Sequence, residues 1–262
     1  MRVKLTIEYD GTNYAGWQRQ ENALAVQQVV EEALFRLTGK PHAVTGASRT
    51  DAGVHAFGQV AHFDAQSRIP AEKYAYALNT VLPADVRIRD SRAVAEDFHA
   101  RFSAKGKWYC YSIFNDAHAS AILRNTHAHV MYPLDVDAMR REAQCAVGRH
   151  DFRAFAASGS VVKDTVRTIH SIEIARQGKC VSMQVRGNGF LYNMVRIIAG
   201  TLVEVGRGAF APSEVKEMLE QKERGRAGAT APPQGLVLLG IVYDGQADTE
   251  RGQIQKDTGI DR

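Results

Sequence analysis

Apolar residues recur along the chain with two different periods, and each period predicts a different element. Residues 3–9 (VKLTIEY) alternate apolar and polar positions, the period of a β-strand with one buried face. From Val26 to Leu37 the apolar residues recur at helical spacing, and Gly39-Lys40-Pro41 then stops the helix. Both patterns return along the whole sequence, so strands and helices are predicted to interleave.

The other elements follow from the same two patterns. Further strands are expected at residues 42–44, 54–63, 85–95, 108–114, 168–175, 179–186 and 236–243, and further helices at 70–78, 134–147, 190–205 and 213–221. Ser213 is expected to act as the N-cap of the last helix. The segments on either side of Gln177-Gly178 have the pattern of a hairpin. Because hairpin-like pairs of strands occur between the helices, the pattern predicts an α+β fold with antiparallel sheets, not a doubly wound parallel sheet.

The length of 262 residues suits one large domain or two modest ones. We place a division near residue 105, which gives an N-terminal α/β half of residues 1–105 and a C-terminal α/β half of residues 106–245. The remaining residues, 246–262, are polar and rich in Asp, Gln and Gly, so we expect a poorly ordered tail.

The composition is that of a globular protein and leaves the partner open. Hydrophobic residues make up 45% and charged residues 24% of the chain, which argues against disorder. No apolar run approaches the ~18 residues of a membrane span, and the start turns polar too soon for a signal peptide. We therefore expect a cytoplasmic protein. The 33 Lys+Arg against 29 Asp+Glu give a net charge of +4, which permits a polyanionic partner without requiring one.

Several common catalytic and binding motifs are absent from the sequence. There is no GxxxxGK[ST] phosphate loop, no Rossmann glycine triplet, no HExxH and no GxSxG around a serine. The three cysteines form no CxxC pair, so neither a zinc knuckle nor a disulfide framework is indicated. His127-Ala128-His129 lacks a third ligand nearby and is interpreted as two structural histidines.

The segment Arg49-Thr50-Asp51-Ala52-Gly53-Val54-His55-Ala56 carries the candidate chemistry. Its loop lies between two predicted strands, where Asp51 could face a cleft and Arg49 could keep it ionised. An ionised aspartate can act as a nucleophile or as a base. The alternative, that Asp51 only stabilises a turn, stays open on the residues alone.

Two other features have a functional and a structural interpretation. Arg101, Lys105 and Lys107 lead without an intervening acid to Tyr109, a combination that suits a nucleic-acid backbone with a base stacked on a ring. Ordinary packing between strands explains the tyrosine equally well. Arg196 lies among Val195, Ile197 and Ile198, so it either has an anionic partner or lies on an exposed helix face.

The loop around Asp51 resembles the signature loop of the TruA family of tRNA pseudouridine synthases. Further blocks that resemble this family occur in the same order along the chain, from residue 3 to about residue 243. They are Glu8-Tyr9-Asp10-Gly11, Tyr14, Gly16-Trp17-Gln18-Arg19-Gln20, Gly58-Gln59-Val60-Ala61-His62-Phe63, Asp97-Phe98-His99-Ala100-Arg101-Phe102-Ser103-Ala104, Met194-Val195-Arg196, Glu204-Val205-Gly206 and Gly235-Leu236. One departure is Ser48, since many relatives have glycine directly before the arginine.

The resemblance implies a fold, a reaction and partners. The fold consists of two α/β halves with mostly antiparallel sheets that face a central basic cleft. The reaction converts uridine to pseudouridine at positions 38, 39 and 40 of the tRNA anticodon stem-loop, and it needs no cofactor and no metal. The resemblance also implies a homodimer that binds tRNA across both subunits.

The resemblance also implies the roles of individual residues. Asp51 matches the catalytic aspartate, and Arg49 the arginine that helps to displace the target nucleotide. Tyr109 matches the tyrosine that stacks on the target uracil, and Arg196 the arginine that pairs with the aspartate. Arg101, Lys105 and Lys107 are expected to bind substrate along the cleft.

Two rival functions remain. One is a catalytically inactive RNA-binding protein of the same fold, which an isomerisation assay would reveal. The other is an unrelated small-molecule enzyme with Asp51 as a general base, which would have no affinity for an anticodon stem-loop.

Overall fold

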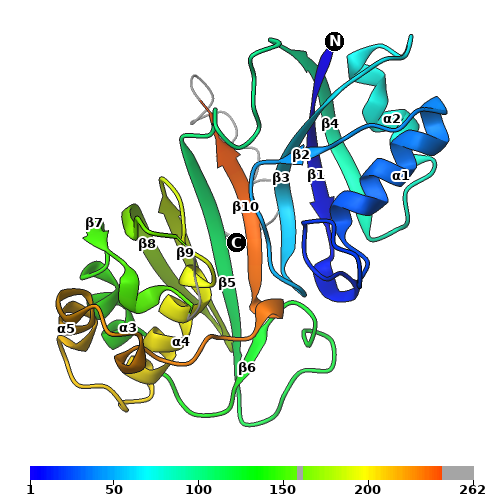
Figure 1. Ribbon diagram of the computed structural model, residues 1–262. Helices are drawn as coiled ribbons and strands as arrows, with labels where there is room; N and C mark the ends of the chain where they lie inside the picture. Colours follow the sequence, from blue (N-terminus) through cyan, green and yellow to red (C-terminus); the bar gives the residue numbers. More distant parts are fainter. Residues whose placement is uncertain (158–161, 244–262) are drawn as a thin grey trace. The chain divides into compact units, whose positions relative to one another are not determined.

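The computed structural model describes residues 1–157 and 162–243 (Figure 1). The chain divides into two compact units. Among the described residues, unit 1 contains Met1–Lys105 and residues 237–243, and unit 2 contains residues 106–157 and 162–236. The tail predicted at residues 246–262 lies outside the described residues.

The sheet of unit 1 is mostly antiparallel. It consists of β1 (Arg2–Tyr9), β3 (His55–Asp64), β4 (Val86–Val94) and β10 (Leu236–Val242), in the order β4-β1-β3-β10. β1 pairs antiparallel with both β3 and β4, the short β2 (Thr45–Gly46) pairs antiparallel with β3, and β10 pairs with β3 in parallel. The final strand belongs to unit 1 from Val237, whereas our division at residue 105 assigned it to the C-terminal half.

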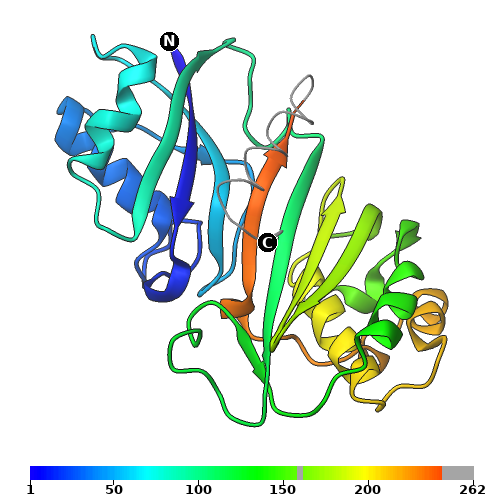
Figure 2. The ribbon, with the colours of Figure 1, turned by 180° about the vertical axis from the view of Figure 1, so that it is seen from behind.

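Two helices accompany the sheet of unit 1. α1 (Val26–Thr38) buries Val26, Val30, Ala33 and Leu34, and it ends at Gly39, whose φ of 72° is readily adopted only without a Cβ. α2 (Tyr74–Asn79) follows the 3-10 turn η2 (Ala71–Lys73) and packs against β4, and α1 packs against α2 (Figures 1 and 2). A second 3-10 turn, η1 (Gly11–Asn13), directly follows β1 and its N-cap Asp10.

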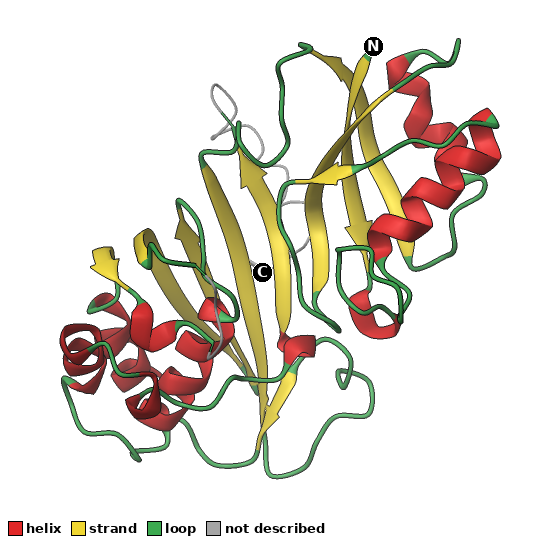
Figure 3. Cartoon of the chain, in the orientation of Figure 1, coloured by secondary structure: helices red, strands yellow, loops and turns green. Residues whose placement is uncertain are grey.

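The described part of unit 2 contains five further strands with helices packed against them. Its strands are β5 (Gly106–Asn115), β6 (Ala128–Val130), β7 (Gly148–Asp151), β8 (Val166–Gln177) and β9 (Cys180–Gly187). The order is β5-β9-β8-β7 with antiparallel pairing, and β6 adds to β5 in parallel. Figure 3 shows the helices of this unit gathered beside the sheet: α3 (Val136–Gln144) packs on β8 and α4 (Met194–Gly206), and α5 (Glu214–Gln221) packs on α3.

The described residues of unit 2 also contain three 3-10 turns, and each unit has its own buried core. The turns are η3 (Arg153–Phe155), η4 (Arg224–Arg226) and η5 (Pro233–Gly235). The largest fully buried side chains of unit 1 include Trp17, Phe63 and Tyr74, and those of unit 2 include Tyr111, Phe152 and Phe155. The α+β class with mostly antiparallel sheets, predicted from the pattern of strands and helices, is confirmed.

Three local predictions differ from the structure. Residues 42–44 form no strand; the pairing with β3 occurs instead at Thr45 and Gly46. The helix predicted from residue 190 begins only at Met194, after Asn193 in a left-handed conformation. Ser213 is at the N-cap position of α5, but its side chain makes no capping hydrogen bond.

Candidate active site

The loop that carries Asp51 connects β2 to β3 and comprises residues 47–54, which we call the aspartate loop. The loop starts with a backbone bond from Ala47 N to Val60 O at 2.8 Å and ends with one from Val54 N to Asp51 O at 3.1 Å. Gly53 takes a φ of 77° within that final turn. The backbone oxygen of Asp51 therefore closes the turn.

The middle of the triplet Arg49-Thr50-Asp51 is fixed to the protein interior. Thr50 is buried, and its Oγ1 lies 2.7 Å from the hydroxyl of Tyr9 at the end of β1. Its backbone oxygen accepts a hydrogen bond from Trp17 N at 3.1 Å. Arg49 on one side is exposed, and Asp51 on the other is half-buried. Thr50 thus anchors the loop to the interior between an exposed Arg49 and a half-buried Asp51.

Gln59 holds the start of the aspartate loop from inside the sheet. This side chain on β3 is 0% exposed. Its Nε2 donates to Ser48 O at 2.7 Å, and its Oε1 accepts from Ser48 N at 3.2 Å. Ser48 is itself buried. The small side chain expected at this position is therefore enclosed, and the backbone on both sides of it is satisfied.

Residues 10–17, which follow β1, wrap around the other end of the loop. Gly53 N donates to Tyr14 O at 3.2 Å, and Gly11 N donates to His55 Nδ1 at 3.0 Å. A Cβ on Gly11 would lie 2.0 Å from Val54 O, and one on Gly16 would lie 2.3 Å from Thr50 O. Glycine is therefore required at both positions, because the backbone of residues 10–17 is in direct contact with that of the aspartate loop.

The basic residues predicted to bind substrate fall in both units. Arg101 and Lys105 belong to unit 1 and are exposed, whereas Lys107 is half-buried on β5 in unit 2. Lys105 N donates to the last residue of β10, Val242, at 2.8 Å. The guanidinium carbon of Arg101 lies 5.7 Å from the centroid of the Phe102 ring.

Tyr109 and Arg196 belong to unit 2. Tyr109 lies on β5 opposite Val185 of β9, is 6% exposed, and meets Phe190 edge-on at a centroid distance of 5.3 Å. Arg196 on α4 is half-buried, so it does not lie on a fully exposed helix face. Its Nε donates to Ala231 O and its Nη1 to Asn193 Oδ1, both at 2.8 Å.

Within each unit the structure groups these residues. Arg49 and Asp51 share the aspartate loop, and Arg101 and Lys105 lie in the same unit. Lys107 and Tyr109 share β5 in unit 2, which also contains Arg196. Sequence reasoning assigned no role to Gln59, His62 or His99. All three are contained in blocks that resemble the family, which is the signal that could have identified them.

Within the part of the chain that the structure describes, no group of three or more His, Cys, Asp or Glu could hold a metal ion. In those same residues no helix has the length and apolar character needed to cross a membrane.

Two α+β units, one of which holds an Arg-Thr-Asp loop between β2 and β3, are the arrangement expected of a pseudouridine synthase. A model of the family described as tRNA pseudouridine synthase matches residues 5–103 and 143–244. The chain belongs to this family. It is accordingly an isomerase that acts on uridine in tRNA.

Relatives with this activity in their names match nearly end to end. "tRNA pseudouridine synthase A" of Ruminiclostridium cellulolyticum is 53% identical over 243 residues, which cover 92% of this chain and 99% of the relative. The protein of the same name from Acetivibrio thermocellus is 52% identical over 241 residues, with the same coverage of 92% and 99%. The protein of that name from Syntrophotalea carbinolica is 52% identical, with 92% of this chain and 96% of the relative covered.

Proposed function

We propose that this enzyme isomerises uridines 38, 39 and 40 of the tRNA anticodon stem-loop, with Asp51 as the catalytic carboxylate. The observation that carries the proposal is the arrangement of the triplet Arg49-Thr50-Asp51. Thr50 is buried and bonded to Tyr9 and Trp17, while Arg49 is exposed and Asp51 is half-buried. A fixed carboxylate beside an exposed guanidinium suits catalysis on an anionic substrate.

The reaction is an internal exchange of bonds. The bond from uracil N1 to ribose C1′ breaks, the base turns, and C5 bonds to C1′; the proton leaves C5 and N1 gains one. The base must leave the stack first, at a cost of a few kcal/mol. Asp51 either attacks the ribose or the base covalently, or removes a ribose proton to give a glycal.

The other site residues are assigned roles in the same proposal. Arg49 would occupy the space vacated by the flipped nucleotide. Tyr109 would hold the detached base against its ring, and Arg196 would keep the catalytic carboxylate ionised. Arg101, Lys105 and Lys107 would contact the tRNA backbone, so that binding weakens as salt rises.

A comparison of two aspartates tests the central assignment. Asp51→Asn is expected to abolish tritium release from C5-labelled tRNA while a gel shift still detects the complex. Asp90→Asn, at an exposed carboxylate on β4, is the matched control and is expected to retain turnover. Wild-type tritium release by Asp51→Asn would exclude Asp51 as the catalytic group.

Three anticodon stem-loops, each with uridine at only one of the positions 38, 39 and 40, test the substrate positions. Pseudouridine is expected in all three. A substrate with uridine only outside these positions is the negative control, and conversion of that substrate would contradict the proposed specificity.

The proposal includes a homodimer in the cytoplasm. Sedimentation of the protein is expected to give twice the mass of the 28.9 kDa chain. A monomer that still isomerises tRNA would remove the dimer from the proposal. Fractionation of cells should recover the protein with the soluble tRNA pool.

A further inference from the structure

The turn of residues 98–103 in unit 1 presents a large apolar side chain to solvent. Phe102 is 76% exposed. The guanidinium carbon of its neighbour Arg101 lies 5.7 Å from the ring centroid, and the ring of His99 lies 4.3 Å away at an angle of 32°. One face of the turn thus combines a positive charge with an aromatic ring.

His99 fixes the backbone of this turn. Its Nδ1 accepts the N–H groups of both Arg101 and Phe102 at 3.2 Å. Its own N–H donates to Ser103 Oγ at 3.0 Å, and its carbonyl accepts from Ser103 N at 2.9 Å. The ring acts as a cap: one acceptor atom satisfies two backbone donors that no helix or strand supplies with partners.

A second histidine holds the turn from below. His62 on β3 accepts the N–H of Ala100 at its Nδ1, at 3.1 Å, and its ring meets that of His99 at 5.0 Å. The carbonyl of Ala100 accepts from the hydroxyl of Tyr243 at 2.6 Å. Ala100 is 0% exposed, so the centre of the turn is anchored while its tip projects.

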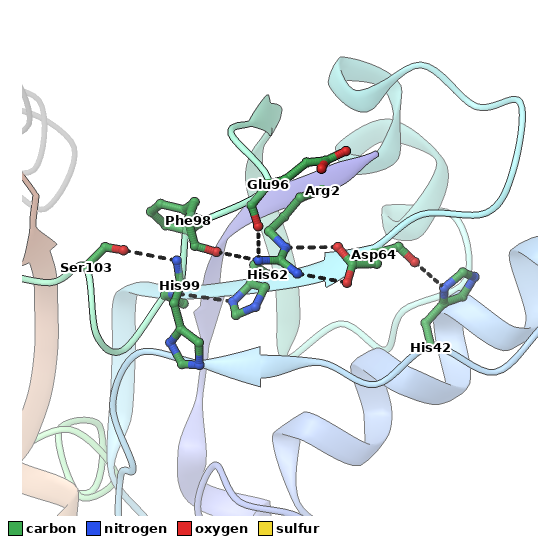
Figure 4. A network of polar contacts seen from close by, with 9 residues as sticks. Arg2, His42, His62, Asp64, Glu96, Phe98, His99 and Ser103 are labelled. Carbon is green, nitrogen blue, oxygen red and sulfur yellow. Dashed lines mark hydrogen bonds and ion pairs between the residues drawn. The ribbon is translucent and has the colours of Figure 1, made fainter.

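Arg2 completes the network, as Figure 4 shows. It binds both oxygens of Asp64 at 2.9 Å and donates through Nη1 to Phe98 O at 3.0 Å and to Glu96 O. The start of the turn is thereby tied to β1 and β3. Every backbone N–H of residues 98–103 has a partner, although the tip of the turn is open to solvent.

From this geometry we infer that Arg101 and Phe102 form a platform for an unpaired tRNA nucleotide, and that His99 and His62 are its positioning residues. Phe102 stacks on the base, and Arg101 contacts the adjacent phosphate. A turn already fixed in shape loses little entropy when a base binds to it. The inference rests on the proposed function and adds a binding element to it.

Charge favours RNA over a protein as the occupant. No acid occurs from Phe98 to Lys107, while Arg101, Lys105 and Lys107 all fall within that span. Stacking between aromatic rings and bases tolerates any sequence, so the two residues would accept any of the four nucleotides.

Unit 1 also contains a matched control residue for the effect of an exposed aromatic side chain. Tyr76 on α2 is 74% exposed, and Lys73 Nζ lies 5.3 Å from its ring centroid. It thus has a ring and a neighbouring cation like the tip of the turn. No histidine cap holds it, because its backbone belongs to a helix.

The first experiment measures tRNA affinity and KM with the full chain and an unmodified tRNA transcript. Phe102→Ala is expected to weaken binding about 5- to 150-fold, the range for loss of one stacked base. Phe102→Tyr, which keeps the ring, and Tyr76→Ala are expected to bind like wild type. Equal weakening by Tyr76→Ala would show a general surface effect and overturn the inference.

The second experiment tests positioning by His99. His99→Ala is expected to weaken binding as Phe102→Ala does, and the double variant to add little. His99→Asn is expected to restore affinity, because an asparagine Oδ1 can accept the same two N–H groups. If His99→Ala does not fold, His99→Asn with and without Phe102→Ala supplies the comparison. Full additivity of the two changes would overturn the positioning role.

Measurements on the wild-type protein distinguish a failure of this inference from a failure of the proposed function. Tritium release by wild type together with unchanged affinity of Phe102→Ala overturns this inference alone. Absence of both tritium release and tRNA binding by wild type overturns the proposed function, and this inference with it.

Discussion

Gln59 and Ser48 are joined by a reciprocal pair of hydrogen bonds that holds the aspartate loop to β3. Gln59 Nε2 donates to Ser48 O at 2.7 Å and Oε1 accepts from Ser48 N at 3.2 Å, both fully inside the protein. Ser48 precedes Arg49, and Asp51 follows three residues later. The amide therefore sets where the loop leaves the sheet.

Replacement of Gln59 by leucine is expected to lower both stability and rate. Leu fills a similar volume but removes the two hydrogen bonds to the buried N–H and C=O of Ser48, at about 1–3 kcal/mol each. Urea unfolding measures the stability, and single-turnover tritium release measures the rate. Gln59→Glu keeps one acceptor and is the partial control. A leucine variant with wild-type stability would contradict the importance of this pair.

Gly16→Ala is expected to disturb the aspartate loop directly. Gly16 has a φ of 87°, and a Cβ there would lie 2.3 Å from Thr50 O. The change combines backbone strain with a clash, so stability should fall by more than the ~1–2 kcal/mol of a left-handed residue alone, and turnover should fall with it.

Gly39→Ala is the matched control for that change. Gly39 has a φ of 72° at the end of α1, and a Cβ added there would meet nothing within 4 Å. It should lose about 1–2 kcal/mol from strain and keep its kcat/KM. Equal losses of turnover in the two variants would mean that Gly16 acts only through global stability.

The local sequence pattern was sufficient to predict those strands and helices whose structure depends mainly on their own residues. The strand predicted at residues 3–9 is β1, and the helix predicted at 26–37 is α1 with one residue more. Pairing between distant segments was not predictable in this way. β2 forms at Thr45 because Thr45 lies opposite His62 across the ladder, not because residues 42–44 are good strand formers.

The ends of helices were missed for the same reason. α5 was expected to be capped by the Ser213 side chain. Instead Glu142 at the end of α3 accepts Ser213 N at 2.8 Å and Val215 N at 3.3 Å, so the cap comes from another helix. A carboxylate supplied by a packed neighbour satisfies the first-turn donors as well as a local side chain does.

The residues of the candidate site could likewise be predicted only in part from the sequence. Asp51 and Arg49 could be singled out from one octapeptide, and the resemblance gave them roles. The residues that hold that octapeptide, Tyr9, Gly16 and Gln59, are distant in sequence from Thr50 or buried in a strand. Their importance depends on contacts that only the fold creates.

The stability of unit 1 is expected to fall as pH decreases through the range of histidine titration. Burial lowers the pKa of His62, and the charges of Arg2 and His99 lower it further, against an opposite effect of Asp64. The unfolded chain then takes up a proton near pH 6.5, before the folded one does. The stability that depends on neutral His62 is therefore fully present above about pH 6.5 and is lost as the pH falls below it. The neutral ring is also the form whose Nδ1 accepts Ala100 N–H.

Urea unfolding at pH 7.5 and 5.5 measures this dependence. His62→Gln keeps an acceptor but has no titratable group, so its free energy of unfolding should change less between the two pH values than that of wild type. Histidines that do not contact His62 contribute equally to both proteins and cancel in the comparison. An identical pH dependence of the two proteins would exclude His62 as its source.

Arg196→Ala is expected to lower both stability and turnover. Its guanidinium donates to Ala231 O and Asn193 Oδ1, and loss of these bonds at a half-buried position should cost about 1–3 kcal/mol. Arg207→Ala, which removes an exposed bond to Glu204 of 3.3 Å, is the control and should change stability by less than about 1 kcal/mol. Thermal melts measure the stability of each variant, and single-turnover rates measure its turnover. Lower stability with a wild-type rate assigns Arg196 to the fold alone. If the rate falls as well, Arg196→Lys, which keeps the charge without the planar fork, shows whether charge suffices for turnover.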